Sequence, residues 1–212
     1  MSRFQAKVVF LLLALSLLFI PNPLRAAEEP KVEGVYMRLQ SHPFKFDGKQ
    51  VEVLEFLSFY CSHCYHFENE IPIIRGNFPK KITWKVMPVY WGKGSSKPGE
   101  AYLLAEEAGM GDKMKAALFN AEFVEQANIG NVEVLERIGA KLGLGFDFSK
   151  RLRSGEKAKE AQRAMELAKE YGVSETPTLV VSGNLMTTAS MTGGEMGAFT
   201  QNVISMVKSI LK

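Results

Sequence analysis

The sequence is poor in cysteine: its 212 residues include only two, Cys61 and Cys64. A disulfide between residues this close together encloses almost no chain, so it would restrict the unfolded state very little and add little stability. The pair is therefore better explained by chemistry than by a scaffolding role.

A run of apolar residues long enough to cross a membrane is also missing. Residues 8–20 contain one polar residue, Ser16, and fall short of the roughly 20 residues that a spanning helix needs. They follow a basic start and precede the small residues Ala26 and Ala27, which is the pattern of a secretory signal peptide. We expect residues 1–26 to be removed on export, and a retained N-terminal anchor is the alternative.

The exported chain lacks an excess of charge of either sign. Residues 1–26 contain three basic residues, Arg3, Lys7 and Arg25, and no acidic one, so their removal leaves 23 basic and 23 acidic residues. The basic character of the whole sequence comes from the export signal, and no basic stripe with interleaved aromatic residues is present. We therefore expect no binding to nucleic acid.

Two stretches have the composition of buried strands. Residues 51–59 are rich in β-branched and aromatic side chains and lead directly into the cysteines, and residues 82–89 form a second such stretch. Residues 62–78 are expected to form a helix kinked at Pro72, because proline cannot donate a hydrogen bond back to Glu68. The strand candidates near the C-terminus are residues 178–182 and 185–187, and residues 195–211 are the candidate closing helix.

Residues 100–171 differ in character from the rest of the chain. Helix formers dominate there, and apolar residues recur every three or four positions. The first part is expected to contain two helices that are separated by residues 109–111. Two further helices are expected. One begins at the N-cap Asn131 and ends at Gly143, and the other begins at the N-cap Ser154 and ends at Gly172.

Cys61, Ser62, His63 and Cys64 lie at the junction between the first strand and its helix. Cys61 is expected at the N-cap, where free N–H groups and the helix dipole favour a thiolate. The imidazole of His63 is expected to add a cation or a hydrogen-bond donor, so that both effects lower the pKa of Cys61. Cys64, one turn later, is expected to face inward. Cys61 is then the sulfur that meets the substrate, and Cys64 is the resolving partner.

The second element of the predicted site is far away in the sequence. Thr176 and Pro177 directly precede a strand candidate. Only X-Pro bonds are commonly cis, and the upstream CxxC pair favours a cis bond here. The backbone of Thr176 would then face the cysteines, where an extended substrate peptide can pair with it.

The segment from Phe56 to Glu68, Phe-Leu-Ser-Phe-Tyr-Cys-Ser-His-Cys-Tyr-His-Phe-Glu, resembles the active-site segment of the DsbA family. Thr176 and Pro177 match the cis-proline site of that family. The resemblance covers essentially all of the exported chain and implies an α/β, thioredoxin-like fold with an inserted helical domain. The implied boundaries are a signal peptide at 1–26, thioredoxin-like parts at 27–92 and 172–212, and a mainly helical insertion at 93–171.

The resemblance also implies an activity and partners. The protein would be a periplasmic thiol:disulfide oxidoreductase, a monomer without a bound cofactor or metal, that introduces disulfides into folding exported proteins with free thiols. A DsbB-type membrane quinone reductase would reoxidise it. The sequence differs from the best-known members at Ser62, where they have proline, and at Thr176, where they commonly have valine.

Two glutamates are candidate modulators of the cysteines. Glu55 interrupts an apolar strand, and a buried carboxylate needs a partner or a proton. The family resemblance implies that Glu55 moves protons at the buried cysteine, and Lys85 on the next strand is a possible partner for it. The alternative places Glu55 on an exposed edge. Glu68, one turn beyond Cys64, is a charge modulator or a solvated helix residue.

Two other functions are alternatives to disulfide formation. Cys61, His63, Cys64 and His66 are soft and imidazole ligands, as a metal-binding protein would need, although residues around the start of one helix splay around its axis. The same redox chemistry could instead serve a disulfide reductase or isomerase. Isomerases of this superfamily generally carry a dimerisation domain, for which no residues remain here.

Overall fold

The structure is a computed structural model of the chain, and it describes residues 30–92 and 94–212. The expected signal peptide, residues 1–26, lies outside the described residues. From Lys31 to Lys212 the chain forms one compact unit. In the described part of the chain, no helix is both long and apolar enough to cross a membrane.

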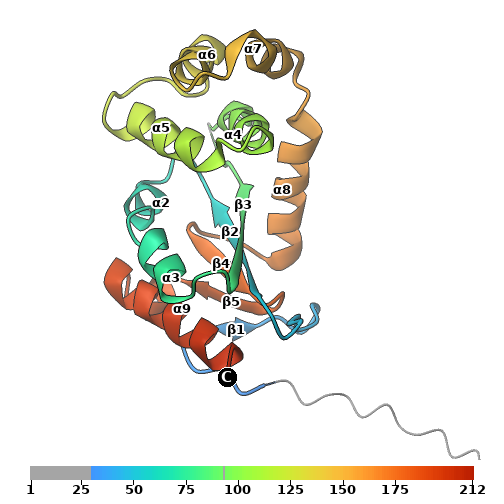
Figure 1. The fold of residues 1–212 in the computed structure, drawn as a ribbon, viewed down its shortest axis with the longest axis vertical. Coiled ribbons are helices and arrows are strands. Elements are labelled where there is room, and N and C mark those ends of the chain that lie inside the picture. Colours follow the sequence, from blue (N-terminus) through green and yellow to red (C-terminus); the bar gives the residue numbers. More distant parts are fainter. Residues whose placement is uncertain (1–29, 93) are drawn as a thin grey trace, which may run out of the picture. The chain divides into compact units, whose positions relative to one another are not determined.

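The core of the fold is a mixed sheet with the strand order β1-β5-β4-β2-β3 (Figure 1). The central strand β2 pairs in parallel with β3, in the register Glu55 to Val86, and antiparallel with β4. Parallel neighbours need a crossover connection, and the CxxC helix supplies it. The strands are β1 (Met37–Arg38), β2 (Val51–Leu57), β3 (Ile82–Pro88), β4 (Thr178–Val181) and β5 (Leu185–Thr188).

The helices confirm the predicted insertion, because α4 to α8 all lie between β3 and β4 in the sequence. In Figure 1 the helices α4 to α7 lie beyond the end of the sheet at which β2 leads into α2. The helices are α2 (Ser62–Phe67), α3 (Ile71–Asn77), α4 (Lys97–Glu107), α5 (Gly111–Phe123), α6 (Val132–Lys141), α7 (Gly145–Ser154), α8 (Ala158–Tyr171), the 3-10 turn η2 (Ser190–Thr192) and α9 (Met196–Ile210).

Apolar side chains cover both faces of the sheet, which explains why β2 lacks a polar face. On one face, Val53 packs in a cluster with Ile74 of α3 and Phe199 of α9. On the other face, Leu54 packs in a cluster with Tyr171 of α8. A third cluster joins the end of β2 and Cys64 to the helices of the insertion. The active-site helix therefore rests on the sheet and on the insertion at once.

The helix expected over residues 62–78 is interrupted. The chain forms α2 and α3, with a turn at residues 68–70 between them. Pro72 lies in the first turn of α3, where a missing N–H has no helical acceptor to lose. The expectation of one kinked helix was therefore wrong, because the proline starts a new helix.

Ser154 was expected to cap a helix but ends one. It is the last residue of α7, a helix that the sequence analysis did not predict, and Gly155 follows in the left-handed conformation with φ 68°. This conformation costs glycine little, so Gly155 stops α7 and α8 starts at Ala158. The other predicted end, Gly172, does close α8 with φ 70°.

Candidate active site

Cys61 caps the short helix that follows the central strand. Its backbone is extended (φ −104°, ψ 115°), and its Sγ accepts a hydrogen bond from the N–H of Cys64 at 3.4 Å. Cys61 is half-buried, whereas Cys64 is 0 % exposed within the cluster that joins the sheet to the insertion. Both are free thiols. An approaching sulfur can therefore reach Cys61 but not Cys64.

The surroundings of Cys61 lower its pKa from 9.0 to about 5. The largest cause is a hydrogen bond from the thiol of Cys64, and burial opposes it. Thr176 and the backbone N–H groups of Cys64 and His63 lower the pKa further. At neutral pH the reduced protein therefore holds Cys61 as a thiolate.

The pKa of Cys64 moves in the opposite direction. Burial raises it well above 9.0, and the neighbouring sulfur of Cys61 raises it further. One thiolate and one thiol thus lie side by side, and the thiol donates to the thiolate. This asymmetry matches the expected division between an outer attacking sulfur and an inner resolving sulfur.

His63 acts differently from the sequence expectation. Its side chain is exposed, and its backbone N–H is the group that lowers the pKa of Cys61. Ser62 is exposed as well. The N-cap geometry lowers the pKa through the backbone N–H of position 63, which every residue except proline can supply, and the imidazole is not the contributing group.

The loop before β4 faces the cysteines. The Thr176–Pro177 peptide bond is cis, as predicted from the sequence. The Sγ of Cys61 lies 3.2 Å from the carbonyl oxygen of Thr176, a residue 115 positions away in the chain. A backbone carbonyl next to the reactive sulfur can accept a hydrogen bond from an extended peptide whose own sulfur is joined to Cys61.

Glu55 is fully buried, so the alternative of an exposed edge is wrong. The expected partner Lys85 is also wrong: it pairs with Glu52 at 2.5 Å, because alternate residues of a strand point to opposite faces. The indole N–H of Trp84 donates to Glu55 Oε2 at 2.7 Å, and the ammonium of Lys115 lies 3.6 Å from the same oxygen.

Lys115 comes from α5 of the insertion and connects Glu55 to Glu68, whose Oε1 lies 2.8 Å from its Nζ. Its side chain is only 3 % exposed. Burial by itself lowers the pKa of Lys115, but Glu55 and Glu68 outweigh burial, so its pKa is raised. Burial raises the pKa of Glu68 to about 7; Lys115 opposes this shift and Glu55 adds to it. Two acidic side chains thus share one buried cation.

Neither Trp84 nor Lys115 is predicted as a site residue from the sequence. Lys115 does have a recognisable signal, because it lies three and four positions before the buried Leu118 and Phe119. A lysine on the apolar face of a helix needs a buried anion as partner. Trp84 gave no such signal, because an aromatic residue in a strand is common.

Within residues 30–92 and 94–212, no group of three or more histidine, cysteine, aspartate or glutamate side chains is placed to hold a metal ion. Of the four candidate ligands, Cys64 is buried while His63 and His66 are exposed. The helix start therefore spreads these side chains between the core and the surface.

Comparison with known proteins agrees with this geometry. A family model described as a DSBA-like thioredoxin domain matches residues 52–199, which include the CxxC pair, the insertion and the cis-proline. The thiol:disulfide interchange protein DsbA of Azotobacter vinelandii is 28% identical over 166 residues, which cover 77% of each chain.

Solved structures show the same architecture. The crystal structure of the oxidoreductase DsbA from Xylella fastidiosa superimposes with a TM-score of 0.69 at 25% identity, covering 85% of this chain and 97% of that one. The structure of Pseudomonas aeruginosa DsbA gives a TM-score of 0.67 at 24% identity and covers 82% of this chain and 91% of the other. At 24% identity, the similarity to the Pseudomonas aeruginosa protein is evidence for a shared fold.

Proposed function

Because the chain belongs to the DSBA-like thioredoxin domain family and is a thiol:disulfide oxidoreductase, we propose that it introduces disulfides into exported proteins through Cys61 and Cys64. One observation carries the proposal. Cys61, half-buried beside the Thr176 carbonyl, is stabilised as a thiolate, while Cys64 is buried with a raised pKa. A stabilised thiolate favours the reduced protein, which makes its disulfide an oxidant.

The reaction starts from the Cys61–Cys64 disulfide. A substrate thiolate attacks Sγ of Cys61, the bond between the two cysteines breaks, and Cys64 leaves as a thiolate that takes up a proton. A second substrate thiolate then attacks the substrate sulfur of the mixed disulfide and releases Cys61 as a thiolate. The substrate loses two electrons, and the protein gains them.

The buried carboxylates support the proton transfer at Cys64. Glu55 Oε1 is buried and has no hydrogen-bond partner in the described part of the chain, so this oxygen is available to accept a hydrogen bond. Glu68 is linked to Glu55 through Lys115 and is partly open to solvent, with its side chain 20 % exposed. We assign Glu55 and Glu68 to modulating roles, in which a proton from solvent reaches the interior by way of these side chains.

The partners follow from the same family membership. The proposed substrates are unfolded or folding exported proteins with free thiols, and the proposed electron acceptor is a DsbB-type membrane quinone reductase. We propose that the protein works in the periplasm after removal of residues 1–26. The exchange involves only sulfur and protons, so it requires no bound cofactor or metal.

The test is a redox equilibration of the purified protein against glutathione, combined with trapping. We expect the Cys61–Cys64 pair to be reduced in mildly reducing buffer. Cys64→Ser, first joined at Cys61 to glutathione by exchange with glutathione disulfide, should form a mixed disulfide with a reduced unfolded protein and release glutathione, whereas Cys61→Ser should form none. A pair that stays oxidised in the same buffer would identify a reductase. A Cys64→Ser variant that traps nothing and keeps full oxidase activity would overturn the assigned roles.

A further inference from the structure

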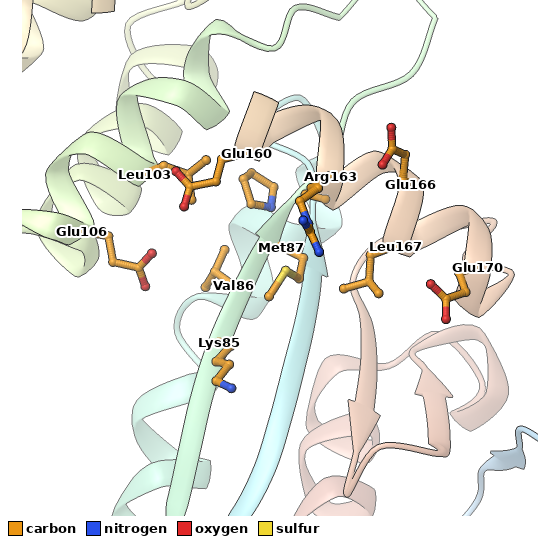
Figure 2. A pocket seen from close by; sticks show the side chains of 12 residues that line it. Lys85, Val86, Met87, Leu103, Glu106, Glu160, Arg163, Glu166, Leu167 and Glu170 are labelled. Atoms are coloured by element: carbon orange, nitrogen blue, oxygen red, sulfur yellow. The ribbon is translucent and has the colours of Figure 1, made fainter. Parts of the chain in front are cut away.

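A groove runs along the free edge of the sheet, apart from the cysteines. Its volume is about 740 Å³, and its base is formed by β3 from Lys85 to Pro88. The walls come from α4, with Leu103 and Glu106, and from α8 (Figure 2). The strand order places β3 at the edge, with β2 as its neighbour on one side and no strand of the described residues on the other.

The backbone of Val86 faces this groove. The N–H of Val51 donates to Lys81 and the N–H of Val89 donates to Leu57, both at 2.8 Å, which fixes the parallel ladder. In such a ladder alternate residues of β3 bond to β2, so the N–H and C=O of Val86 point to the open edge. Unpaired groups on an edge strand are a template for one more strand.

The side chains around the edge select the kind of segment that fits. Leu103, Val86 and Leu167 supply apolar surface. Four glutamates line the groove, against one lysine and one arginine. The lysine, Lys85, is already paired with Glu52. The groove is therefore acidic, and its charged residues are Glu106, Glu160, Glu166, Glu170, Lys85 and Arg163.

We propose that this groove binds an extended segment of the substrate polypeptide, one with alternating apolar and basic side chains, as an added strand on β3. The inference rests on the proposed function, because an unfolded exported protein offers such segments with free backbone groups. Apolar side chains of the segment pack between α4 and α8, and its basic side chains meet the glutamates. Binding in the groove adds a second contact to the one at Cys61, and it keeps the substrate near Cys61 while the substrate thiols react.

Binding is tested with a cysteine-free peptide of alternating valine and lysine, observed through the backbone amide signals of the full-length protein in NMR. We expect shifts on β3 and α8. The double variant Glu106→Lys, Glu166→Lys should bind about tenfold more weakly, because attraction becomes repulsion at two sites. Glu125→Lys, Glu133→Lys is the matched control, since it changes the net charge equally on exposed residues outside the groove.

Two further peptides test the chemistry of recognition. Replacement of every lysine by glutamate should abolish the shifts, and N-methylation of the backbone should weaken binding because it removes the strand hydrogen bonds. Equal binding of the acidic peptide, equal loss in both double variants, or shifts confined to another surface would overturn the proposal. Shifts on β3 that depend on protein concentration alone would assign the groove to a second copy of the chain and also overturn it.

The catalytic consequence is measured with two substrates that carry the same dithiol. One is a short peptide, and the other has a valine-lysine segment attached. The groove variant should raise KM for the long substrate and leave the short one unchanged; equal KM values for the long substrate would contradict the proposal. If the wild-type protein oxidises neither substrate, the proposed function fails, while the NMR titration still decides whether the groove binds.

Discussion

At the scale of single residues, the reactivity of Cys61 depends on a donor that is itself a cysteine. The thiol of Cys64 is the largest influence on the pKa of Cys61. Cys64→Ala should therefore raise that pKa clearly above its value of about 5. Cys64→Ser should raise it less, because a hydroxyl still donates a hydrogen bond. The ultraviolet absorbance of the thiolate as a function of pH measures both variants, and identical titrations in the two would contradict this account.

His63 allows the sequence and the structure to be tested against each other. From the sequence alone, His63→Ser raises the pKa of Cys61, because a cation is lost. The structure predicts a titration close to that of the wild type, because the contributing group is the backbone N–H, which serine retains. The same absorbance measurement decides, and a large upward shift would return the imidazole to the mechanism.

Lys115 is expected to have a large effect on stability. Lys115→Met leaves two carboxylates in the core without their cation and should destabilise the fold by about 3 kcal/mol. Lys113→Met is the control, because Lys113 lies exposed on the same helix. Urea unfolding measures both. Adding Glu68→Gln to Lys115→Met should recover part of the loss, since the orphaned charge is removed; no recovery would mean that Lys115 acts by packing alone.

At the scale of elements, α6 and α7 pack through a glycine. A Cβ atom on Gly139 would collide with the ring of Phe148, which is buried in the cluster that joins the insertion to Cys64. Gly139→Ala should therefore destabilise the protein by about 1–3 kcal/mol. Gly76→Ala, in α3, meets nothing within 4 Å and should be neutral or stabilising. Thermal unfolding compares the two, and equal effects would show that α6 can move away from α7.

Strands β2 to β5 and most helices follow from local sequence, whereas the short strand β1 was not predicted. Strand β2 is apolar on both faces because helices cover both, so its composition alone identifies it. Helix α7 was missed, although Phe148 and Leu152 have helical spacing and Gly155 is a stop. Ser154 there competed as an N-cap, but Gly155 takes the left-handed conformation and makes Ser154 the end of α7.

At the scale of the whole molecule, the two redox states should differ in stability in a pH-dependent way. The pKa of Cys61 is about 5 in the folded reduced protein against 9.0 for an ordinary thiol. Between these values the folded state holds fewer protons than the unfolded state, so the stability of the reduced form rises with pH. The oxidised form has no such group.

Urea unfolding of both forms between about pH 4 and 8 tests this linkage. We expect the reduced form to be the more stable one at neutral pH, and its advantage to fall as the pH falls and to level off below the Cys61 pKa of about 5. The variant Cys61→Ala, Cys64→Ala is the control, since it should show no change on adding reductant. A reduced form that is less stable at neutral pH would oppose an oxidising role.

The sequence by itself determined the chemistry and the order of most of the elements. The CxxC pair, the strand before it and the helix after it are neighbours in the chain, so short-range preferences place Cys61 at an N-cap. Composition also separated the helical stretch from the strands. The domain boundaries at 27–92, 93–171 and 172–212 stay a proposal on the same basis.

Only the tertiary structure decided which distant groups meet. Lys115 reaches Glu55 across 60 positions in the numbering, while the nearer Lys85 points to another face. Thr176 reaches Cys61 across 115 positions, and the groove exists only because α4, α8 and β3 converge. Such contacts depend on how the insertion packs against the sheet, and local preferences carry no information about that packing.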